Sequence, residues 1–478
     1  MKTNAKAVNN RRTEGGARAS AITPEQELRR QVMALMLWEN GGQTEKNVAS
    51  LIPKCRPEFV AACAFEARTK MKLRHVPLFI AREMARHPEH KSLVGKLLPD
   101  LINRADEINE FMAIYWKNGK TPISAQVKKG LAAAFKKFGP YALAKYNKTD
   151  MAIKMRDVMF LTHAKPADAP GDKYTKEVRK AERAGQKARQ LTKGEKLFSD
   201  LINDKLETPD TWETNLSAGA DKKETFERLM SENKLGALAF IRNLRNMVQA
   251  GVSRQAMKEY GAKVNLEYVL PFRFLSAARQ VPGMEDLLEP MMLRCLEGQP
   301  KLPGKTVLIL DTSGSMHAGI SGKSDLTRLD TAAALAILVR EICEDVVIYC
   351  TAGSDGARRH ATMQIPARRG FALADYIRSN EVQGKIGGGG IFLKQCLDFV
   401  EMNEKTADRV ITLTDEIDCD DKASPEGAST FGENNYIINV ATQANGIAYS
   451  KFTHINGWSE AVIDFIRVLE EDQAAELQ

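Results

Sequence analysis

Length, composition and hydropathy exclude several classes of protein. The chain has 478 residues, of which 43% are hydrophobic and 27% charged, and these are ordinary values for a globular protein of two or three domains. No run approaches the ~20 apolar residues of a membrane span, and the N-terminus lacks the apolar core of a secretory signal. The seven cysteines are never spaced as CxxC, so neither a disulfide framework nor a zinc site is indicated. We expect a cytoplasmic protein that does not enter a membrane.

Charge is distributed unevenly along the chain. The formal net charge is +8, but residues 301–478 hold 17 Lys+Arg and 26 Asp+Glu, a net of −9, which leaves 52 and 35, a net of +17, for residues 1–300. A basic surface attracts phosphates and gains further from the release of counterions. The first 300 residues are therefore the predicted polyanion-binding part. Solvated helix faces are the alternative interpretation of the same charge.

The N-terminal part is predicted to be a flexible basic head over residues 1–21 and a helical module over residues 22–300. Apolar residues recur in the module at spacings of three and four, as in Leu131, Phe135 and Phe138, which is typical of amphipathic helices. Similar units lie at about 57–87, 91–116 and 225–250. Helices of this length with short loops between them predict stacked antiparallel pairs that resemble HEAT or armadillo units. An irregular helical domain is the alternative.

The sequence changes its pattern after residue 300. The segment from Gln299 to Lys305 contains two prolines and a glycine and is predicted to be a linker. Apolar runs that are typical of buried parallel strands follow at 306–310, 346–350, 410–413 and 436–440. Helical stretches lie between or after them at 329–341, 391–400 and 459–469. Residues 301–478 are therefore predicted to form a doubly wound, Rossmann-like α/β domain.

The first of these strands ends in a group of oxygen-bearing side chains. The segment Asp311-Thr312-Ser313-Gly314-Ser315 contains the pattern DxSxS, and ligands of such sheets bind where the strands' carboxyl ends meet loops. A hard divalent cation prefers oxygen ligands, and one carboxylate with two hydroxyls can supply three. A loop without a ligand is the alternative, which the position directly after a buried strand makes weaker.

This pattern resembles the metal-ion-dependent adhesion site of von Willebrand factor A domains. The resemblance implies that Asp311, Ser313 and Ser315 hold Mg²⁺ and that Asp415, after the strand at 410–413, is the second carboxylate. A capping or loop aspartate is the alternative for Asp415. The family also places a threonine in a Gly-Gly-Thr loop, whereas residues 387–391 read Gly-Gly-Gly-Gly-Ile. We therefore expect either weak Mg²⁺ binding that relies on water ligands or no binding.

The helical module carries a second, independent resemblance. Four segments look like parts of the TROVE module: 71–77 (MKLRHVP), 145–148 (KYNK) with 153–158 (IKMRDV), 161–166 (LTHAKP) and 235–246 (LGALAFIRNLRN). In Ro proteins this module is followed by a von Willebrand factor A domain, and the order is the same here from about residue 22 to 470. The chain thus resembles the Ro (TROVE) ribonucleoprotein family of the bacterial or phage type.

The resemblance implies a non-catalytic, monomeric ring of helical repeats that the A domain closes. It implies binding of small noncoding Y-like RNAs on the basic outer surface and of single-stranded ends of misfolded RNAs in the central hole, in RNA quality control or processing. The exoribonuclease polynucleotide phosphorylase is an implied partner. By the match of segments, Lys145, Lys148 and His163 would contact Y-like RNA. Helix capping is the alternative for His163.

One further basic segment and two rival functions complete the interpretation. Residues 173–196 hold nine Lys+Arg against three acids, which suits either a mobile loop that clamps RNA or a solvated helix. An enzyme would use Asp311 as a phosphoryl-accepting nucleophile, but Ser313 stands where a second carboxylate is usual. A metal-dependent protein-adhesion module without an RNA role is the other alternative, and it leaves the N-terminal charge of +17 unexplained.

Overall fold

The computed structural model describes most of the chain as two compact units. The described residues are 23–34, 42–69, 71, 73–147, 151–169, 191–266, 269, 271–320, 326–420, 434–441, 452–456, 462, 463, 466, 467 and 470. One unit comprises Lys46–Thr214, and the other comprises Met1–Glu45 with Asn215–Gln478. The predicted head over residues 1–21 lies outside the described residues. No helix among those described is long and apolar enough to cross a membrane.

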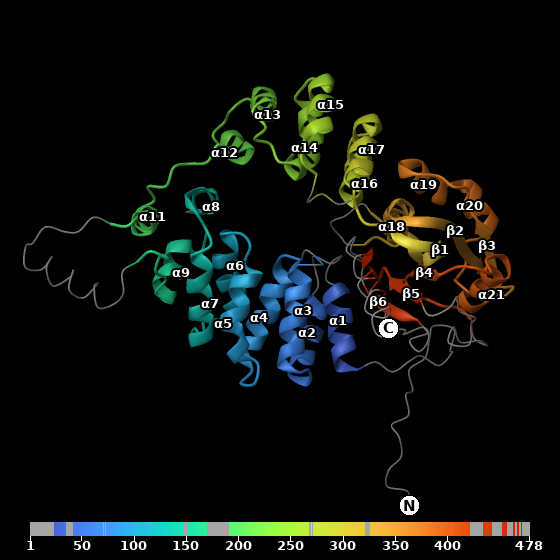
Figure 1. Cartoon of the computed structure of the whole chain (residues 1–478), viewed down its shortest axis with the longest axis horizontal. Helices are drawn as coiled ribbons and strands as arrows, with labels where there is room; N and C mark the ends of the chain where they lie inside the picture. The colour runs from blue at the N-terminus through green and yellow to red at the C-terminus, as the bar shows by residue number, and fades with distance from the viewer. Residues whose placement is uncertain are drawn as a thin grey trace, which may run out of the picture. The chain divides into compact units, whose positions relative to one another are not determined.

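The unit formed by Lys46–Thr214 is a stack of helices. Its elements are α2 (Gly42–Leu51), η1 (Ile52–Lys54), α3 (Pro57–Thr69), α4 (His75–Arg86), α5 (Lys91–Leu101), α6 (Asp106–Tyr115), α7 (Ala125–Phe135), α8 (Pro140–Tyr146), α9 (Met155–Thr162), α11 (Lys193–Ile202) and α12 (Trp212–Ser217). Successive helices lie side by side, because α3 contacts α4 and α5, α5 contacts α7, and α7 contacts α9 (Figure 1). The predicted units 57–87 and 91–116 are each a pair of helices, as the repeat interpretation expects.

A buried ion pair fixes the turn between α5 and α6. The Arg68 guanidinium on α3 donates to both carboxylate oxygens of Glu107, at 2.8 and 2.7 Å. Glu107 also accepts the backbone N–H groups of Asn103 and Arg104. Its side chain is fully buried. The charge on Arg68 is therefore used inside the stack, and it does not contribute to the basic surface that composition alone predicts.

The second unit begins with helices and ends with a sheet. Its helices before the sheet are α1 (Pro24–Ala34), α13 (Lys222–Ser231), α14 (Ala237–Gln249), α15 (Arg254–Lys263), α16 (Pro271–Gln280) and α17 (Glu285–Arg294). The predicted unit 225–250 corresponds to α13 and α14, which are separated where Asn233 takes a left-handed conformation. Consecutive helices again pair, since α13 contacts α14 and α16 contacts α17.

The sheet has six strands in the order β3-β2-β1-β4-β5-β6. They are β1 (Leu302–Asp311), β2 (Cys343–Ser354), β3 (Arg359–Gln364), β4 (Arg409–Thr414), β5 (Asn434–Asn439) and β6 (Thr453–Asn456). All neighbours are parallel except β2 and β3. Helices η2 (Gly314–His317), α18 (Arg328–Ile342), α19 (Gly370–Ile377), α20 (Asn380–Ile386) and α21 (Leu393–Asn403) join them. The predicted fold class, a helical module followed by a doubly wound α/β domain, is confirmed.

Several details of the predicted domain differ from the structure. The polar edge strand β3 and the four-residue β6 were not predicted, because neither carries a long apolar run. The strand β1 begins at Leu302, inside the predicted linker, and its register shifts between Leu302 and Lys305. Pro303 lacks a backbone donor and Gly304 has a φ of 76°, so this part of the strand is irregular. The predicted helix at 459–469 lies largely outside the described residues.

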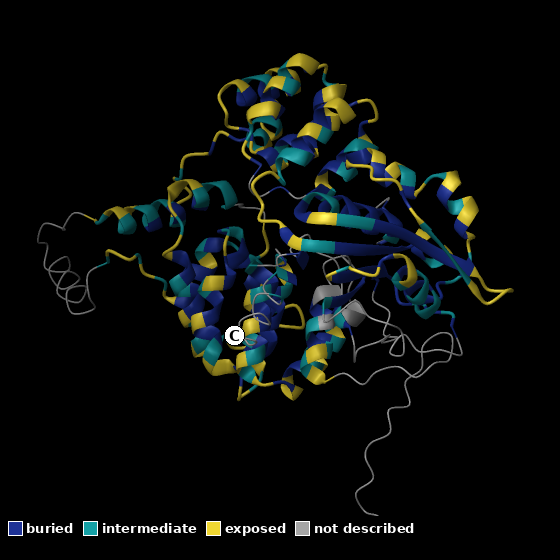
Figure 2. Ribbon diagram, turned by 45° about the vertical axis from the view of Figure 1, so that its right-hand side comes forward, coloured by how far each residue is buried: buried dark blue, intermediate teal, exposed yellow. Residues whose placement is uncertain are grey.

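The central strands are buried on both faces, which explains their continuous apolar runs. Val307 and Ile309 of β1 pack with Leu397 and Val400 of α21 in one hydrophobic cluster. The alternate residue Leu308 is equally buried, and α18 contacts β1 and β2. The sheet consequently appears as a buried layer in Figure 2.

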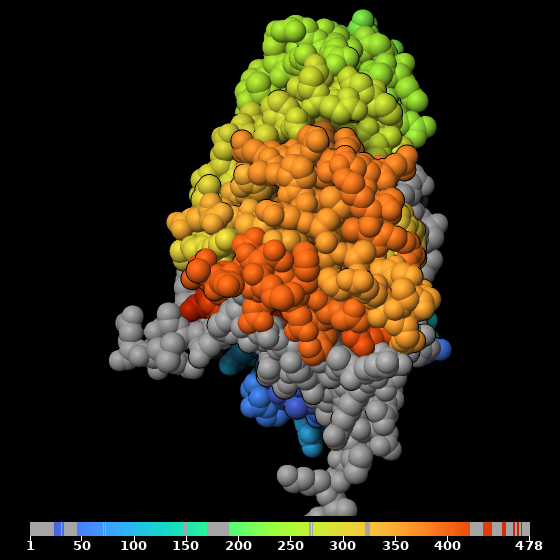
Figure 3. Space-filling model, turned by 90° about the vertical axis from the view of Figure 1, so that its right-hand side faces the viewer, coloured from blue at the N-terminus to red at the C-terminus, as the bar shows by residue number. Residues whose placement is uncertain are grey.

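Helices that precede the sheet in the chain also pack on the sheet domain. The helix α16 contacts α18, and α17 contacts α19, so the surfaces of these segments are continuous in Figure 3. Arg279 of α16 donates to both carboxylate oxygens of Asp330 on α18. Glu289 of α17 accepts the backbone N–H of Phe371 at 2.8 Å. The helix α1 contacts β6 at the edge of the sheet.

Candidate functional site

The sheet brings the predicted metal ligands together at the carboxyl ends of β1 and β4. These strands are parallel neighbours, with Leu310 paired to Leu413, so Asp311 and Asp415 emerge at the same edge. The Asp311 carboxylate accepts the Ser313 backbone N–H at 2.8 Å and the Thr414 hydroxyl at 2.6 Å. The hydroxyl oxygens of Ser313 and Ser315 are 3.1 Å apart. We call Asp311, Ser313, Ser315 and Asp415 the strand-end cluster.

Burial dominates the electrostatics of the strand-end cluster. Asp311 and Asp415 are both fully buried. Burial raises the pKa of Asp311 to about 7, and the nearby charge of Asp415 adds to the rise. A third buried carboxylate, Asp418, also has its pKa raised to about 7, chiefly by burial. It accepts the backbone N–H groups of Leu393 and Asp420.

A guanidinium group contacts Asp415 on one side of the strand-end cluster. Arg328 is the first residue of α18, which begins there because the Thr327 side chain caps the backbone N–H of Asp330. Its Nη1 lies 2.7 Å from Oδ2 of Asp415 and 3.3 Å from the backbone oxygen of Ser315. The Arg328 side chain is only 12% exposed. The protein therefore supplies its own cation to the carboxylate that was predicted to assist a metal.

The glycine loop approaches the cluster without a hydroxyl. The backbone N–H of Gly314 donates to the Gly389 carbonyl at 3.3 Å, so this loop is in the place where the A-domain resemblance needs a threonine. A Cβ at Gly389 would lie 2.6 Å from the Gly353 oxygen, and one at Gly390 would lie 2.1 Å from Sγ of Cys419. Packing therefore opposes side chains at these two positions.

These contacts test whether the cluster fits a magnesium ion. Asp311, Ser313 and Ser315 are oxygen donors of the right kind. Asp415, however, is paired with Arg328, and the loop adds no donor. In the part of the chain that the structure describes, no group of three or more His, Cys, Asp or Glu side chains is arranged to hold a metal. The four predicted residues do not fit a complete magnesium shell as they stand.

The predicted RNA-contacting residues lie on separate elements of the helical stack. His163 is exposed and ends α9, with φ 54° and ψ 38°, so the capping alternative describes its backbone while its imidazole remains available. Lys145 is half-buried on α8, and its ammonium lies 5.6 Å from the centre of the Tyr146 ring. Lys148 lies outside the described residues, as do residues 173–190 of the basic segment.

One tie holds the ends of α8 and α9 near α11. Asp204, just after α11, accepts from the Asn147 amide and from Arg156, both at 3.1 Å. Asn147 follows α8 and Arg156 belongs to α9. The elements that carry Lys145 and His163 are thus joined through a third residue, although no described hydrogen bond joins these two side chains.

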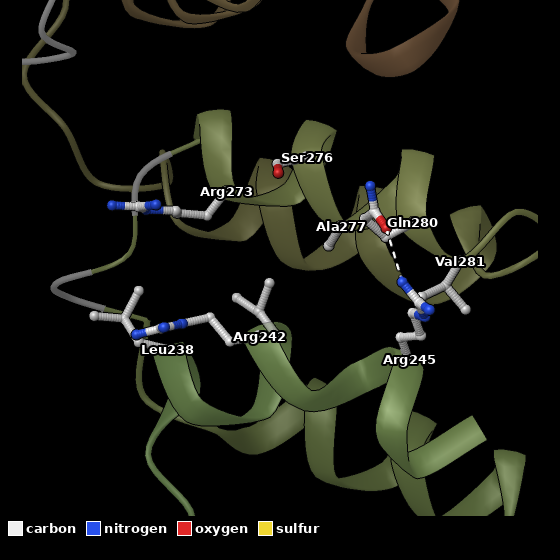
Figure 4. A pocket seen from close by; sticks show the side chains of 9 residues that line it. Leu238, Arg242, Arg245, Arg273, Ser276, Ala277, Gln280 and Val281 are labelled. Carbon is white, nitrogen blue, oxygen red and sulfur yellow. Dashed lines mark hydrogen bonds between the residues drawn. The ribbon is translucent and has the colours of Figure 1, made fainter. Parts of the chain in front are cut away.

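A pocket that the sequence did not predict lies between α14 and α16. Its volume is about 250 Å³, and its lining residues are Leu238, Ile241, Arg242, Arg245, Arg273, Ser276, Ala277, Gln280 and Val281. Arg242 and Arg273 extend to the same side at one end of the pocket, and Arg245 donates to the Gln280 side chain at the other end, at 3.4 Å (Figure 4). We call this the arginine pocket.

The three arginines of the pocket are exposed, and among the described residues none of them has an acidic partner. Residues 237–281 contain seven Lys+Arg against two acids, so carboxylates are scarce in this segment. Arg254, also in this segment, differs because Asp286 lies 2.7 Å from it. An unpaired guanidinium keeps its planar set of donors for a phosphate or carboxylate ligand. The arginine pocket is therefore a candidate site for an anionic ligand.

Part of the arginine pocket lies in a segment that has a family resemblance, but the sequence does not predict the pocket. This segment, 235–246, resembles the TROVE module and contains Arg242 and Arg245. Their spacing of three places them near each other on one helix. Arg273 could not be added without knowing that α16 packs beside α14. The paired state of Arg328 was equally hidden, because its partner Asp415 is 87 residues away.

Comparisons with known proteins agree with this architecture. The TROVE domain family matches residues 202–301, a segment that includes α14 and α16. The solved structure of the Deinococcus radiodurans Ro (Rsr) protein has a TM-score of 0.54 at 16% identity, covering 94% of this chain and 93% of that chain. Telomerase protein component 1 of Mus musculus is 32% identical over 90 residues, and that of Rattus norvegicus is 31% identical over 90 residues.

The two kinds of match carry different information. The match to the telomerase components covers 18% of this chain and only 3% of those relatives, so it concerns one module. The match to the Ro protein extends over nearly the whole chain and concerns the fold. Residues 202–301 therefore match the TROVE domain, and the chain as a whole has the fold of the Ro protein, a helical N-terminal region followed by a six-stranded α/β domain.

Proposed function

We propose that this protein is a non-catalytic RNA-binding protein that binds small noncoding Y-like RNAs and the ends of misfolded or structured RNAs, in RNA quality control or processing. The observation that carries the proposal is the arginine pocket, whose exposed cations lack acidic partners among the described residues and lie inside the segment matched by the TROVE domain. Guanidinium groups bind phosphates, and the backbone of RNA is a polymer of phosphates. Polynucleotide phosphorylase is the exoribonuclease partner that we propose for this role.

We also propose that Lys145, Lys148 and His163 contact structured RNA on the helical stack. The exposed imidazole of His163 could stack on a base or donate to a phosphate, while the lysines add charge along the backbone. The tie through Asp204 joins the end of α8 to the start of α9, so it connects the two helices that carry Lys145 and His163, although His163 lies at the opposite end of α9.

The test of RNA binding uses the full chain and a variant in which Arg242, Arg245 and Arg273 are all changed to Gln. We expect RNA affinity at moderate salt to fall on the order of tenfold or more, since several phosphate contacts are lost. Thermal stability should change little, because the side chains are exposed. Arg254→Gln is the matched control, since it removes one charge that Asp286 already pairs. Unchanged RNA affinity in the triple variant would remove the main support for the proposal.

RNA binding is proposed to be independent of metal. Asp311, Ser313 and Ser315 would bind Mg²⁺ weakly with water as the remaining ligands, or not at all, because Arg328 holds Asp415. Titration calorimetry with Mg²⁺ on the wild type and on Asp311→Ala measures the metal affinity. RNA binding in excess chelator shows whether RNA affinity depends on metal. Tight Mg²⁺ binding lost in the variant, or RNA binding lost in chelator, would contradict the proposal. The same contacts weigh against a metal-dependent adhesion module.

A further inference from the structure

The arginine pocket is more than a patch of positive charge, because its base is apolar. Ile241, Ala277 and Val281 line it and are each less than 9% exposed. Leu238 stands at the rim with 41% of its surface exposed. A site for phosphate alone would need only donors. Apolar lining beneath guanidinium groups suits a ligand that has both an anionic part and a flat, weakly polar part.

The size of the pocket limits what enters it. A volume of about 250 Å³ is below the roughly 300–1,000 Å³ of pockets that enclose whole small molecules. One base with part of its sugar is the portion of a nucleic acid that such a space can take. The remaining arginine donors then face the phosphates that flank that nucleotide. The geometry therefore favours one residue of a longer strand over a free dinucleotide cofactor.

We propose that the arginine pocket binds one unpaired nucleotide of single-stranded RNA. The base lies against Ile241 and Ala277, and Arg242 and Arg273, which extend to the same side (Figure 4), hold the adjoining phosphodiester. The Ser276 hydroxyl and the Gln280 side chain provide polar partners for the base edge or the 2′-hydroxyl. A base inside a duplex is stacked and cannot enter. This inference rests on the proposed RNA-binding function and gives the pocket a distinct task, the recognition of unpaired residues.

The test compares three RNA probes by fluorescence anisotropy with the full chain: a blunt hairpin, the same hairpin with a short single-stranded 3′ tail, and that tail made abasic. Stacking of a base on an aromatic side chain contributes roughly 5- to 100-fold in affinity. The arginine pocket offers guanidinium planes and aliphatic side chains instead, so we expect the wild type to prefer the normal tail over the abasic tail by about fivefold, the lower end of that range. A tail of DNA should bind less tightly than the RNA tail.

Two variants distinguish binding of the base in the pocket from binding of the phosphates by the arginines. Ser276→Phe fills the pocket and keeps all three arginines, and Leu238→Ala removes the exposed rim residue without adding bulk. Both should reduce the preference for the normal tail while the blunt hairpin binds as before. Gln249→Phe, at an exposed position of α14 outside the pocket, is the matched control and should keep the preference.

The outcomes distinguish this inference from the proposed function. Equal affinity of the wild type for normal and abasic tails, with loss of binding in the triple arginine variant, would overturn the inference and leave RNA binding intact. A preference that survives both Ser276→Phe and Leu238→Ala would place the base elsewhere and overturn it as well. Equally tight binding of the DNA tail would overturn the assignment to RNA. Failure of the wild type to bind any probe would contradict both proposals.

Discussion

The strand-end cluster and the arginine pocket hold their charges in opposite ways. In the cluster, Asp311 and Asp415 are fully buried and their oxygens accept hydrogen bonds from Thr414 and Arg328. In the pocket, the arginines are exposed and, among the described residues, lack acidic partners. The cluster matches a sequence pattern known for metal ligands, whereas the pocket belongs to a segment matched only by its family and not by a ligand-binding pattern. A motif thus shows which side chains are present, and only their partners show whether they remain available to a ligand.

Removing one member of the buried pair of Arg328 and Asp415 should reduce the stability of the protein strongly. Asp415→Ala would leave the charge of Arg328, a side chain only 12% exposed, without its carboxylate. Breaking a buried pair in this way typically costs about 3–5 kcal/mol. We expect the free energy of unfolding in urea to fall by that amount.

Asp398→Ala is the matched control for this prediction. Its carboxylate is 40% exposed and pairs with Lys394 within the same helix, so we expect a loss of about 0.5 kcal/mol or less. Equal effects of the two substitutions would contradict this prediction, because the strand-end cluster would then behave as an exposed surface.

The next effect is on the salt dependence of RNA binding. Each phosphate contact to single-stranded RNA contributes about 0.7 to the slope of log affinity against log salt concentration. Arg242→Gln should lower that slope by about 0.7, because its guanidinium has no acidic partner in the described part of the chain. Arg254→Gln should change it much less, since Asp286 already pairs its charge. Binding measured over a salt series gives both slopes, and identical changes would show that pairing does not decide availability.

His163 provides a smaller test on the helical stack. A non-glycine residue in the left-handed region costs about 1 kcal/mol, and His163 lies there with φ 54°. His163→Gly should therefore raise the free energy of unfolding by up to about 1 kcal/mol while weakening Y-like RNA binding. His163→Asn, which tolerates this conformation but lacks the ring, serves as the control. If His163→Gly and His163→Asn both bind RNA with unchanged affinity, His163 serves only to end α9.

Asp330 is a buried carboxyl group that accepts hydrogen bonds from Arg279. We expect its substitution to change the pH dependence of stability by less than the changes predicted above. Burial acts to raise its pKa, but hydrogen bonds from Arg279 and Thr327 outweigh burial and hold the pKa below its ordinary value. A carboxyl group with a lowered pKa stabilises the folded protein above its unfolded-state pKa of about 4 and loses this contribution as the pH falls further. Asp330→Asn should therefore reduce the loss of stability on acidification below about pH 4. Denaturant unfolding of the wild type and the variant at several pH values measures this difference. Parallel curves of unfolding free energy against pH would contradict the prediction.

The order of elements could be predicted from the sequence to a large extent, because burial imposes simple patterns on it. The run around Val307–Leu310 is apolar at every position since β1 is covered on both faces. Edge strand β3 carries no such pattern, and its half-buried residues read as a loop. The pairing of Asp311 with Asp415 came from the resemblance to von Willebrand factor A domains, because the pattern of strands alone does not say that β1 and β4 are neighbours.

The state of the candidate sites could not be predicted, because it depends on contacts between distant residues. Nothing near Arg328 in the sequence indicates Asp415 as its partner. The pocket needs α14 and α16 side by side, and nothing in the sequence indicates that these two helices are neighbours. The predictions for Lys145, Lys148 and His163 stay predictions, since they came from resemblance and no contact in the structure tests them.

The contacts that Arg279 and Glu289 make across residue 300 have a consequence for how the chain unfolds. Arg279 bonds Asp330, and Glu289 bonds the backbone of Phe371, so α16 and α17 are held to the sheet domain on the far side of the change in sequence pattern. A fragment that begins at residue 301 would lose both contacts and expose apolar surface of α18 and α19. The cooperative folding unit therefore extends from α16 into the sheet, and hydrogen exchange should show these helices opening together with α18.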